Sequence, residues 1–287
     1  MIMRNYRETY IRRAEIAQLI ILHQLYLQRD SQGLVFQGGT AIRWCYGGSR
    51  FSEDLDFVTS LPREAVQGIL AKALKGMQKT MVPHFGVGEM TLIEKAGRED
   101  ALKFYADFRP ENSREKISIK IELERLAADK RPDLQHHVLS SLPSVAYLVS
   151  AGEFRVPRPN VVMVAETPAE ILSDKVRSLL ERPYIKGRDL FDVWFLSTVL
   201  KAAVDREMME RKFSLYRAPF QARRDMAYFI RPSEENRKEM AAAIENDLSR
   251  FLPPEVMTVH RQDGFAALLS AVRLLLEDLQ SRGMGLL

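Results

Sequence analysis

The sequence predicts an α+β fold in which a strand-rich first part is followed by an all-helical second part. Apolar and polar residues alternate strictly from Ile117 to Leu123, which is typical of a strand with one buried face. Thr167-Pro168-Ala169-Glu170 combines a capping box with proline at the first helical position, so a helix should begin there. After this point only helical patterns remain, and we expect two domains, 1–165 and 166–287.

Each part contains further predicted elements. In the first part we expect helices over 6–29, 41–46 and 63–79, strands over 34–36, 54–58 and 161–164, and three strands within 87–125. Thr40 should cap the helix over 41–46, and Gly47 and Gly48 should end it. In the second part, apolar residues recur at helical spacing from Phe265 to Leu279, which indicates an amphipathic helix.

Composition places the chain among ordinary globular proteins. Of its 287 residues, 46% are hydrophobic and 28% are charged, which excludes disordered and collagen-like proteins. The single cysteine, Cys45, excludes an intramolecular disulfide framework and an all-cysteine zinc site. The net charge of +4 does not by itself indicate a nucleic-acid binder. No pattern of a targeting segment or a membrane span is found, and we expect a cytoplasmic protein without membrane contact.

The segment from Gly48 to Asp56 carries the most specific chemistry. Asp54 and Asp56 are two apart in a predicted strand, so their carboxylates should share a face, about 6–7 Å apart along the chain. Such a pair is costly unless a cation neutralises it, and hard oxygen ligands suit Mg²⁺ together with substrate phosphates. The Gly48-Ser49 turn would bring backbone amides and a hydroxyl close to an anion. This combination predicts metal-assisted phosphoryl or nucleotidyl transfer, with two solvated aspartates on an exposed strand as the alternative.

A third carboxylate is expected on a neighbouring strand. In 117–123 the apolar residues share one face, and Glu122 lies on the other face with Ser118, Lys120 and Glu124. Glu122 is the better candidate for a metal ligand because an apolar residue flanks it on each side. It could also attract the proton of an attacking hydroxyl. Glu124, or a merely solvated strand face, remains the alternative.

These motifs resemble those of a known family. Gly38-Gly39-Thr40-Ala41, followed by Gly47-Gly48-Ser49-Arg50-Phe51-Ser52-Glu53-Asp54-Leu55-Asp56-Phe57, is similar to the AbiEii/AbiGii-type toxins. These toxins, with the mycobacterial MenT toxins, belong to the DNA polymerase β-like nucleotidyltransferase superfamily. The resemblance implies a polymerase β-like domain over 1–165, built as a mixed sheet with flanking helices. It also implies a helical domain over 166–287 that completes the nucleotide cleft.

Two further family motifs are matched in the helical part. Lys175 matches a helix lysine, and Arg188-Asp189-Leu190-Phe191-Asp192 matches an Arg-Asp-x-x-Asp segment. The resemblance implies that Lys175 neutralises the triphosphate and that Asp189, more than Asp192, orients the nucleotide or the lysine. By spacing alone, Lys175 lies on or beside an apolar stripe and could instead extend outward to solvent. Asp189 could equally serve to stabilise its helix dipole.

A basic and aromatic segment is the candidate for RNA contact. Residues 211–231 contain Asp225 as their single acidic residue, and aromatic residues are interleaved with the basic ones. The basic residues proposed to contact RNA are Arg211, Lys212, Arg217, Arg223 and Arg224. Arginine and aromatic side chains together can bind a phosphate backbone and stack on unpaired bases. The alternative is a solvated helix whose aromatic residues belong to the core.

The resemblance implies a toxin of a toxin–antitoxin or phage-defence system that transfers a nucleotide from an NTP to an RNA acceptor. Asp54, Asp56 and Glu122 would hold two Mg²⁺ ions, and Gly48 and Ser49 would contact the phosphates. The implied acceptor is the 3′ end of a tRNA, and a separate cognate antitoxin would act without a tight complex. The alternatives are transfer to a small molecule, as in antibiotic modification, and a catalytically silent nucleotide- or RNA-binding module.

Overall fold

A seven-stranded mixed sheet forms the centre of the first part of the chain. In the computed structural model, residues 7–96, 100–113 and 115–284 are described, and they divide into two units. The sheet unit comprises 8–47 and 52–166, and the helical unit comprises 167 onward together with Arg7 and the short segment 48–51. The sheet unit therefore ends one residue beyond the expected boundary. The grouping of 48–51 with the helices was not predicted.

The strand order in the sheet is β3-β4-β5-β2-β1-β7-β6. The strands are β1 (Val35–Gln37), β2 (Leu55–Thr59), β3 (Gly88–Lys95), β4 (Ala101–Pro110), β5 (Ile117–Arg125), β6 (Leu134–Val138) and β7 (Val162–Glu166). The pairs β2–β5 and β1–β7 are parallel, whereas the other neighbouring strands are antiparallel. The parallel pairing of β2 with β5 brings together strands that are far apart in the sequence.

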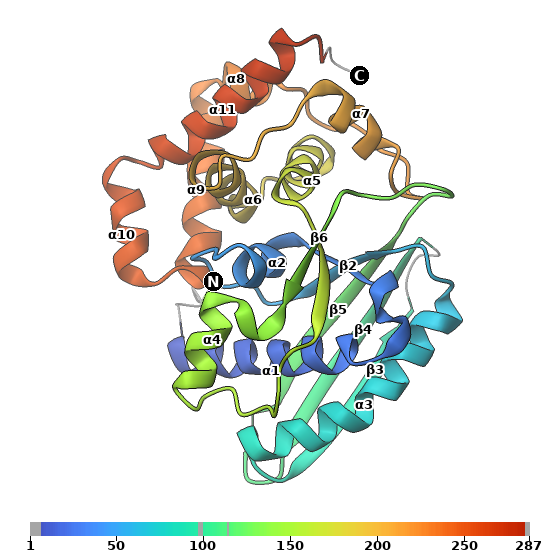
Figure 1. The fold of residues 1–287 in the computed structure, drawn as a ribbon. Helices are drawn as coiled ribbons and strands as arrows, with labels where there is room; N and C mark the ends of the chain where they lie inside the picture. The colour runs from blue at the N-terminus through green and yellow to red at the C-terminus, as the bar shows by residue number, and fades with distance from the viewer. Residues whose placement is uncertain (1–6, 97–99, 114, 285–287) are drawn as a thin grey trace. The chain divides into compact units, whose positions relative to one another are not determined.

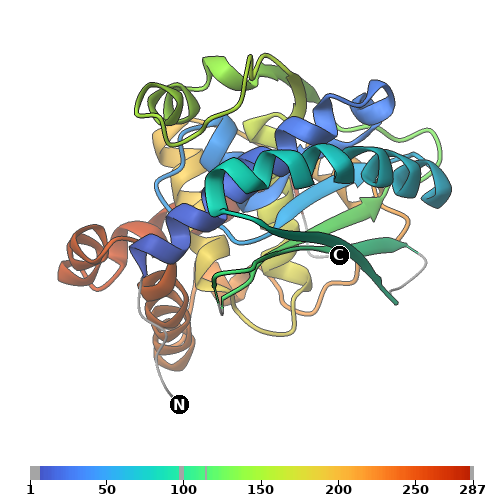
Figure 2. The ribbon, with the colours of Figure 1, turned by 90° about the horizontal axis from the view of Figure 1, so that it is seen from below.

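Helices cover one face of this sheet. Helix α1 (Glu8–Tyr26) and helix α3 (Arg63–Phe85) lie side by side across that face, as Figures 1 and 2 show. Helix α2 (Gly38–Cys45) follows β1 directly, and α4 (Pro143–Ser150) lies between β6 and β7 in the sequence. Two 3₁₀ turns, Arg29–Gly33 and Leu139–Ser141, complete the unit within the described residues.

The two faces of β5 differ as the alternating sequence predicts. Ile117, Ile119, Ile121 and Leu123 are buried, and their partners on β4 are apolar residues of the same covered face. The opposite face carries Lys120 and Glu122, which are partly exposed. Burying one face against α1 and α3 therefore leaves a row of polar side chains on the other face of the sheet.

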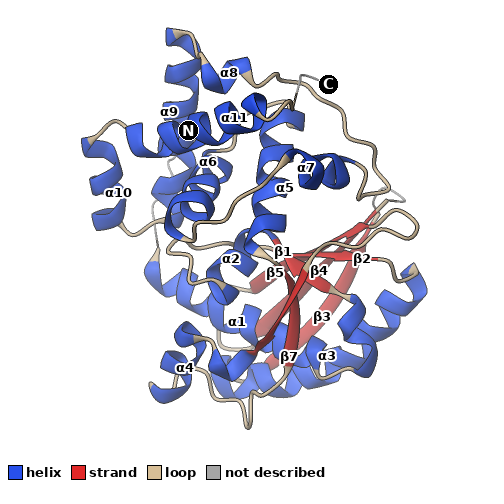
Figure 3. Ribbon diagram, turned by 45° about the horizontal axis from the view of Figure 1, so that its top comes forward, coloured by secondary structure: helices blue, strands red, loops and turns tan. Residues whose placement is uncertain are grey.

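From Pro168 to Ser281 the described elements are helical (Figure 3). They are α5 (Pro168–Glu181), α6 (Gly187–Trp194), a π-helical segment (Phe195–Val199), α7 (Arg206–Phe213), α8 (Ala227–Ile230), α9 (Glu234–Phe251), α10 (Pro254–Gln262) and α11 (Ala266–Ser281). The predicted helix start is confirmed, because the Thr167 hydroxyl accepts a hydrogen bond from the Glu170 amide at 3.3 Å. The Glu170 carboxylate instead pairs with Arg211 and Lys212. Helix α6 packs against α5, α9 and α11, so it forms the centre of this unit.

Some sequence predictions needed correction. Thr40 does not cap a helix: α2 begins at Gly38, and Thr40 lies inside it with its hydroxyl donating to the Asp54 carbonyl. Strand β6 and helix α4 were not predicted, because β6 is largely exposed and lacks an alternating pattern. Helix α3 extends to Phe85, six residues past its expected end, with Pro83 inside its last turn.

No described helix is both long enough and apolar enough to cross a membrane.

Gly187, the first residue of α6, allows close packing against α9. A Cβ atom at this position would lie 2.3 Å from the Ala243 carbonyl oxygen and 2.4 Å from the Ile244 Cα atom. These are backbone atoms of α9, so they cannot move aside as a flexible side chain could. A side chain at position 187 would therefore force α6 away from α9.

We predict that Gly187→Ala lowers the free energy of unfolding by about 1–3 kcal/mol, because it overpacks this helix contact. Gly68→Ala is the matched control: Gly68 lies inside α3, and no atom would lie within 4 Å of its Cβ. This control should gain about 0.5–1 kcal/mol, since alanine favours a helix over glycine. Urea unfolding measures both values. Equal stability of the Gly187→Ala variant and the unmodified protein would contradict the packing argument.

Candidate active site

The predicted carboxylates Asp56 and Glu122 face each other on neighbouring strands. They are register partners in the parallel pair β2–β5, and parallel partners project from the same face of the sheet. Asp54 precedes β2 and lies two residues before Asp56, so the strand begins one residue later than predicted. The structure thus brings together two of the three candidate carboxylates by backbone pairing and the third by a shared cation.

That shared cation is a lysine side chain. The Lys120 ammonium lies 2.7 Å from Asp54 Oδ2 and 2.8 Å from Glu122 Oε2, so it bridges the two carboxylates. Lys103, the β4 partner of Glu122, places its ammonium 2.8 Å from the other oxygen, Glu122 Oε1. Burial alone would raise the pKa of Glu122, but the hydrogen bonds from Lys103 and Lys120 lower it below its ordinary value. Glu122 is therefore ionised at neutral pH, as a metal ligand or a base must be.

The backbone around Asp54 is fixed by side chains of α1 and α2. Gln18 donates to the carbonyl oxygens of Ser52, at 2.6 Å, and Glu53, at 3.2 Å. The Thr40 hydroxyl donates to the Asp54 carbonyl. These bonds hold the extended run before β2 without using either aspartate side chain.

Gly38 leaves room for the Asp56 carboxylate. Its φ angle is +74°, and a Cβ atom here would lie 2.7 Å from Asp56 Oδ2. Gly38 is also the first residue of α2, so this carboxylate lies at the positive end of a helix dipole. The Gly-Gly-Thr motif thus has a local physical role: its first glycine accommodates one aspartate, and its threonine holds the backbone of the other.

The predicted phosphate-binding turn is anchored within the helical unit. Arg50 donates from Nε to Asp192 Oδ1 and from Nη2 to Asp192 Oδ2, both at 2.5 Å, and both residues are buried. The next residue, Phe51, donates its amide to the Phe251 carbonyl at 2.8 Å and stacks on the Phe251 ring. Gly48 is buried and Ser49 is exposed. The anchoring residues thus hold the turn while the Ser49 hydroxyl remains accessible to solvent.

Lys175 lies inside α5's contact with α6 and is paired with two aspartates. Its ammonium is 3.0 Å from Asp189 Oδ1 and 2.8 Å from Asp192 Oδ2. Burial by itself would raise the pKa of both carboxyls. Lys175 and, to a smaller extent, Arg182 lower the pKa of Asp189, whereas Arg50 and, to a smaller extent, Lys175 lower that of Asp192. Burial would likewise lower the pKa of Lys175, but the two aspartates raise it. All these groups are therefore charged at neutral pH, and the lysine does not extend outward to solvent.

The carboxylate chemistry of the sheet unit fits Mg²⁺, which prefers hard oxygen ligands. Asp54 and Glu122 already direct one oxygen each at a single cationic group. Among the described residues, however, no three His, Cys, Asp or Glu side chains are grouped closely enough to hold one metal ion. The oxygen donors are therefore of the type that Mg²⁺ prefers, but the described side chains of Asp54, Asp56 and Glu122 are not gathered around one point.

The chain was compared with known protein families. The family described as "Nucleotidyl transferase AbiEii toxin, Type IV TA system" matches residues 20–271. The chain belongs to the AbiEii nucleotidyl transferase toxin family. Its motif residues, from Gly38 to Asp192, all fall within the matched range.

Two solved structures share the fold of this AbiEii-family chain. JHP933 from Helicobacter pylori has a TM-score of 0.58 at 16% identity, with 96% of each chain covered. A candidate nucleotidyltransferase from H. pylori has a TM-score of 0.56 at 15% identity, covering 97% of this chain and 100% of the other. No curated protein matches the chain at a significant level. At these identities the likeness concerns the fold alone.

The basic segment of the AbiEii-family chain is only partly available to a partner. Arg217 and Arg223 are exposed, and Arg211 and Arg224 are half-buried. Lys212 is buried, and its ammonium lies 2.8 Å from Glu170 Oε2 and 2.7 Å from Asp174 Oδ2. The prediction that Lys212 contacts RNA from the surface is therefore not supported, because its charge is already neutralised inside the unit.

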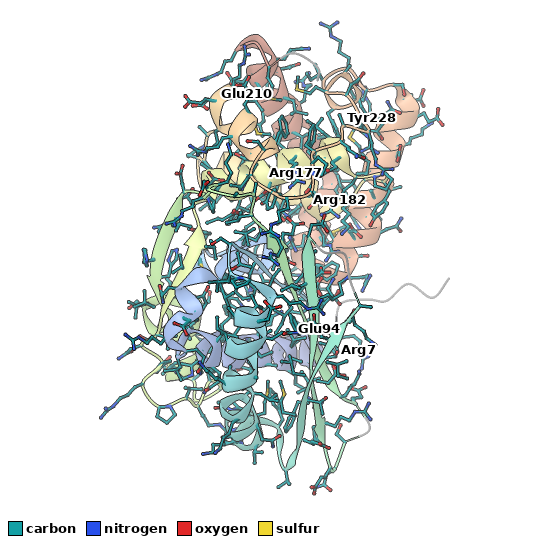
Figure 4. The ribbon with its side chains drawn as sticks, turned by 90° about the vertical axis from the view of Figure 1, so that its right-hand side faces the viewer. Arg7, Glu94, Arg177, Arg182, Glu210 and Tyr228 are labelled. Atoms are coloured by element: carbon teal, nitrogen blue, oxygen red, sulfur yellow. The ribbon has the colours of Figure 1, made fainter. Side chains whose placement is uncertain are left out.

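Aromatic residues of the helical unit also pair with arginines. The Arg177 guanidinium lies 4.3 Å from the centroid of the Tyr216 ring, and the Arg224 guanidinium lies 4.8 Å from that of Tyr228. Figure 4 labels Arg177 and Tyr228 among the side chains of this unit. Tyr216 is buried, as the core alternative for these aromatics expects, whereas Tyr228 is half-buried. The alternative of core aromatics thus applies to Tyr216, whereas Tyr228 is partly exposed, as a residue that contacts RNA would be.

The sequence analysis assigned no role to two charged residues that the structure places at the candidate site. Arg50 lies within the Gly-Gly-Ser-Arg motif, but its partner Asp192 is 142 positions away, so no local pattern indicates their pairing. Lys120 was noted only as sharing a face with Glu122. Its pairing with Asp54 depends on the parallel alignment of β2 and β5, which no local pattern reveals.

We predict that Arg50→Ala lowers the free energy of unfolding by about 3–5 kcal/mol, because it leaves a buried carboxylate without its principal partner. Arg206→Ala is the matched control, since Arg206 forms an exposed pair with Glu210 at 2.7 Å. That change should cost less than about 1 kcal/mol. Denaturant unfolding of the two variants tests the difference, and equal losses would contradict a structural role for the Arg50–Asp192 pair.

We predict that the contribution of Asp189 to stability disappears in acid. Because its pKa is lowered on folding, the stabilisation is complete above the ordinary aspartate pKa of about 3.9 and is lost as the pH falls further. The unfolding free energies of the unmodified protein and Asp189→Asn should therefore differ most above pH of about 4 and converge below it. Thermal unfolding between neutral and strongly acidic pH measures this. A difference that does not change with pH would exclude the proposed charge linkage.

Proposed function

We propose that this AbiEii-family protein transfers a nucleoside monophosphate from an NTP to a hydroxyl of an RNA acceptor, with the 3′ end of a tRNA as the favoured acceptor. The observation that carries this proposal is the arrangement of Asp54, Asp56 and Glu122 around the β2–β5 pair. Two of these carboxylates are strand partners, and two share one cation. Such an arrangement supports nucleotide chemistry because a triphosphate reaches a protein together with divalent cations.

The reaction breaks one bond and forms one bond at the α-phosphorus of the NTP. The acceptor oxygen forms a new bond to the α-phosphorus, and the bond from that phosphorus to the bridging β-phosphate oxygen breaks. Pyrophosphate leaves with the electron pair of that bond, and the acceptor hydroxyl loses its proton. Glu122, ionised by its lysine contacts, is the residue we assign to attract that proton.

Asp54, Asp56 and Glu122 would together hold the Mg²⁺ ions, two of which are expected. When bound, these ions would supply positive charge to the phosphate oxygens and favour loss of the acceptor proton. Gly38 contributes by leaving space for the Asp56 carboxylate. Gln18 and Thr40 contribute by fixing the backbone of the preceding residues, so the carboxylates need little rearrangement.

The residues of the helical unit are assigned to the phosphates. Gly48 and Ser49 would donate to the β- and γ-phosphates, and the Arg50–Asp192 pair would hold their turn in place. Lys175 would contribute a positive charge to the triphosphate, and Asp189 would orient that lysine. The two aspartates take two of the three donors of the Lys175 ammonium, which leaves one donor for a phosphate.

The surface arginines support an RNA acceptor over a small one. Arg217, Arg223 and Arg231 are exposed, and Arg211 and Arg224 are half-buried. Arginines of this kind contact phosphates whatever the base sequence. Modification of a tRNA 3′ end would prevent its aminoacylation and stop translation. This would account for toxicity, and we expect such an activity to act in the cytoplasm. A cognate antitoxin would then restore growth as a separate protein, without a tight complex.

The transfer reaction is tested by incubating the protein with Mg²⁺, each labelled NTP and total tRNA. We predict that label enters tRNA and that Asp56→Asn reduces this at least about a thousandfold, the scale on which loss of a key electrostatic group acts. Glu89→Gln, at an exposed position on β3, is the matched control and should retain full activity.

Each alternative gives a different result in the same assay. Label that enters a small hydroxyl compound but not RNA would indicate an antibiotic-modifying enzyme. Nucleotide binding without any transfer would indicate a silent module. Growth arrest on expression that persists in the double variant Asp54→Asn, Asp56→Asn would exclude catalysis as the cause of toxicity.

The RNA surface gives a separate prediction. Replacing Arg217, Arg223 and Arg231 by alanine should weaken tRNA binding and reduce the slope of log affinity against log salt by about 2 to 3, because up to three phosphate contacts are lost. Arg237→Ala, Lys238→Ala and Arg273→Ala remove the same charge from exposed helix positions elsewhere in the unit and serve as the control. A fluorescence-anisotropy titration at several salt concentrations measures both slopes. Identical slopes would remove this surface from the proposal.

A further inference from the structure

Lys120 occupies the point at which the carboxylates Asp54 and Glu122 converge. Its ammonium is nearly equidistant from one oxygen of each, at 2.7 and 2.8 Å. Lys103 contacts the other oxygen of Glu122, Oε1, at 2.8 Å, and no described contact joins it to Asp54. One lysine therefore bridges the two candidate metal ligands, and the other lies beside them.

We propose that Lys120 is the internal counter-ion of this carboxylate site and exchanges with the divalent cation when the metal binds. The inference rests on the proposed metal-dependent function, because it assigns the ion to Asp54 and Glu122. It concerns the metal-free protein, and it adds to that function a residue that competes with the metal for the same two oxygens.

Electrostatics requires the exchange. Asp54 and Glu122 are directed at one point, and two carboxylates this close repel unless a cation lies between them. A divalent ion bound to the same oxygens at about 2.0–2.1 Å would lie within contact distance of the ammonium. Two cations cannot occupy that position at once, since they would overlap and like charges at such a distance repel. The ammonium must leave when the metal enters.

The side chain is able to leave. Lys120 is partly exposed, with 23% of its side chain accessible, and Asp54 and Glu122 are exposed to a similar degree. A lysine ammonium is a point charge on a flexible four-carbon stem, so it can move without displacing strand β5. By contrast, Lys175 in the helical unit is almost fully buried and has no such freedom.

This arrangement has a functional consequence. In the metal-free protein the lysine keeps both carboxylates ionised and oriented, and it lowers their affinity for free divalent ions. Metal then binds strongly only when it arrives with additional ligands, such as the phosphates of a nucleotide. Lys120 thus favours metal delivered as the metal–nucleotide complex over metal alone.

The test measures Mn²⁺ binding to the nucleotide-free protein by electron paramagnetic resonance. Lys120→Met keeps the length of the side chain and removes its charge, and we expect it to bind Mn²⁺ about tenfold more tightly than the unmodified protein. Lys120→Arg keeps the charge and should bind as weakly as the unmodified protein. Lys116→Met is the matched control, because Lys116 forms a similar pair with Asp107 at 2.7 Å, and it should leave the affinity unchanged.

A thermal melt shows whether the Lys120→Met variant is folded. Lys120→Met should melt at a lower temperature without metal, and Mn²⁺ should raise its melting temperature more than that of the unmodified protein. Equal Mn²⁺ affinity of the two proteins, including no measurable binding by either, would overturn the proposal.

The result is independent of the transfer assay. Tighter Mn²⁺ binding by Lys120→Met in a protein that transfers no nucleotide would support the counter-ion and reject the proposed function. Nucleotide transfer that depends on Asp56, with Mn²⁺ affinity unaffected by Lys120→Met, would support the proposed function and reject the counter-ion role of Lys120.

Discussion

Both units of this protein solve the same electrostatic problem, which is how to hold two carboxylates close together. In the sheet unit, Lys120 bridges Asp54 and Glu122. In the helical unit, Lys175 bridges Asp189 and Asp192. In each case one ammonium offsets the repulsion of two carboxylates, so the segments that carry these three side chains must bring them together. Four members of these two groups, Asp54, Lys175, Asp189 and Asp192, belong to the motifs that resemble the family, whereas Lys120 and Glu122 lie outside them.

The two groups differ in burial, and burial decides what each can do. Lys175 and Arg50 have little access to water, and Arg182 pairs with Asp189 at 3.1 Å, so the helical group contains three cations and two anions. Breaking such a group is costly, and its main effect is to hold the Gly48–Phe51 turn on α6. The sheet group is partly open, so its ion pairs are weaker, and we propose that its cation can be replaced. A rigid group at the turn and an exchangeable group at the carboxylates suit a protein that positions phosphates and admits a metal.

The alternating strand over 117–123 and the helix start at Thr167 were predictable, because each depends on residues close together in the sequence. The locations of Asp56 in β2 and Lys175 in α5 followed from the same local rules and from the family resemblance, whereas Asp54 lies one residue before the strand in which it was expected. The Arg50–Asp192 pair was not predictable, since it joins residues 142 positions apart. Strand β6 was missed because an exposed edge strand lacks the buried face that produces alternation. The burial of Lys212 was hidden within a run of basic residues, where composition cannot distinguish a paired lysine from a solvated one.

A crystal structure of the protein with Mn²⁺ and a non-hydrolysable NTP tests the central claim most directly, because the anomalous signal of manganese locates the ion without assumptions. We predict manganese bound by Asp54, Asp56 and Glu122, with the Lys120 ammonium displaced from between Asp54 and Glu122. Manganese bound elsewhere, or Lys120 still bridging these two carboxylates beside a fully occupied nucleotide, would contradict the account.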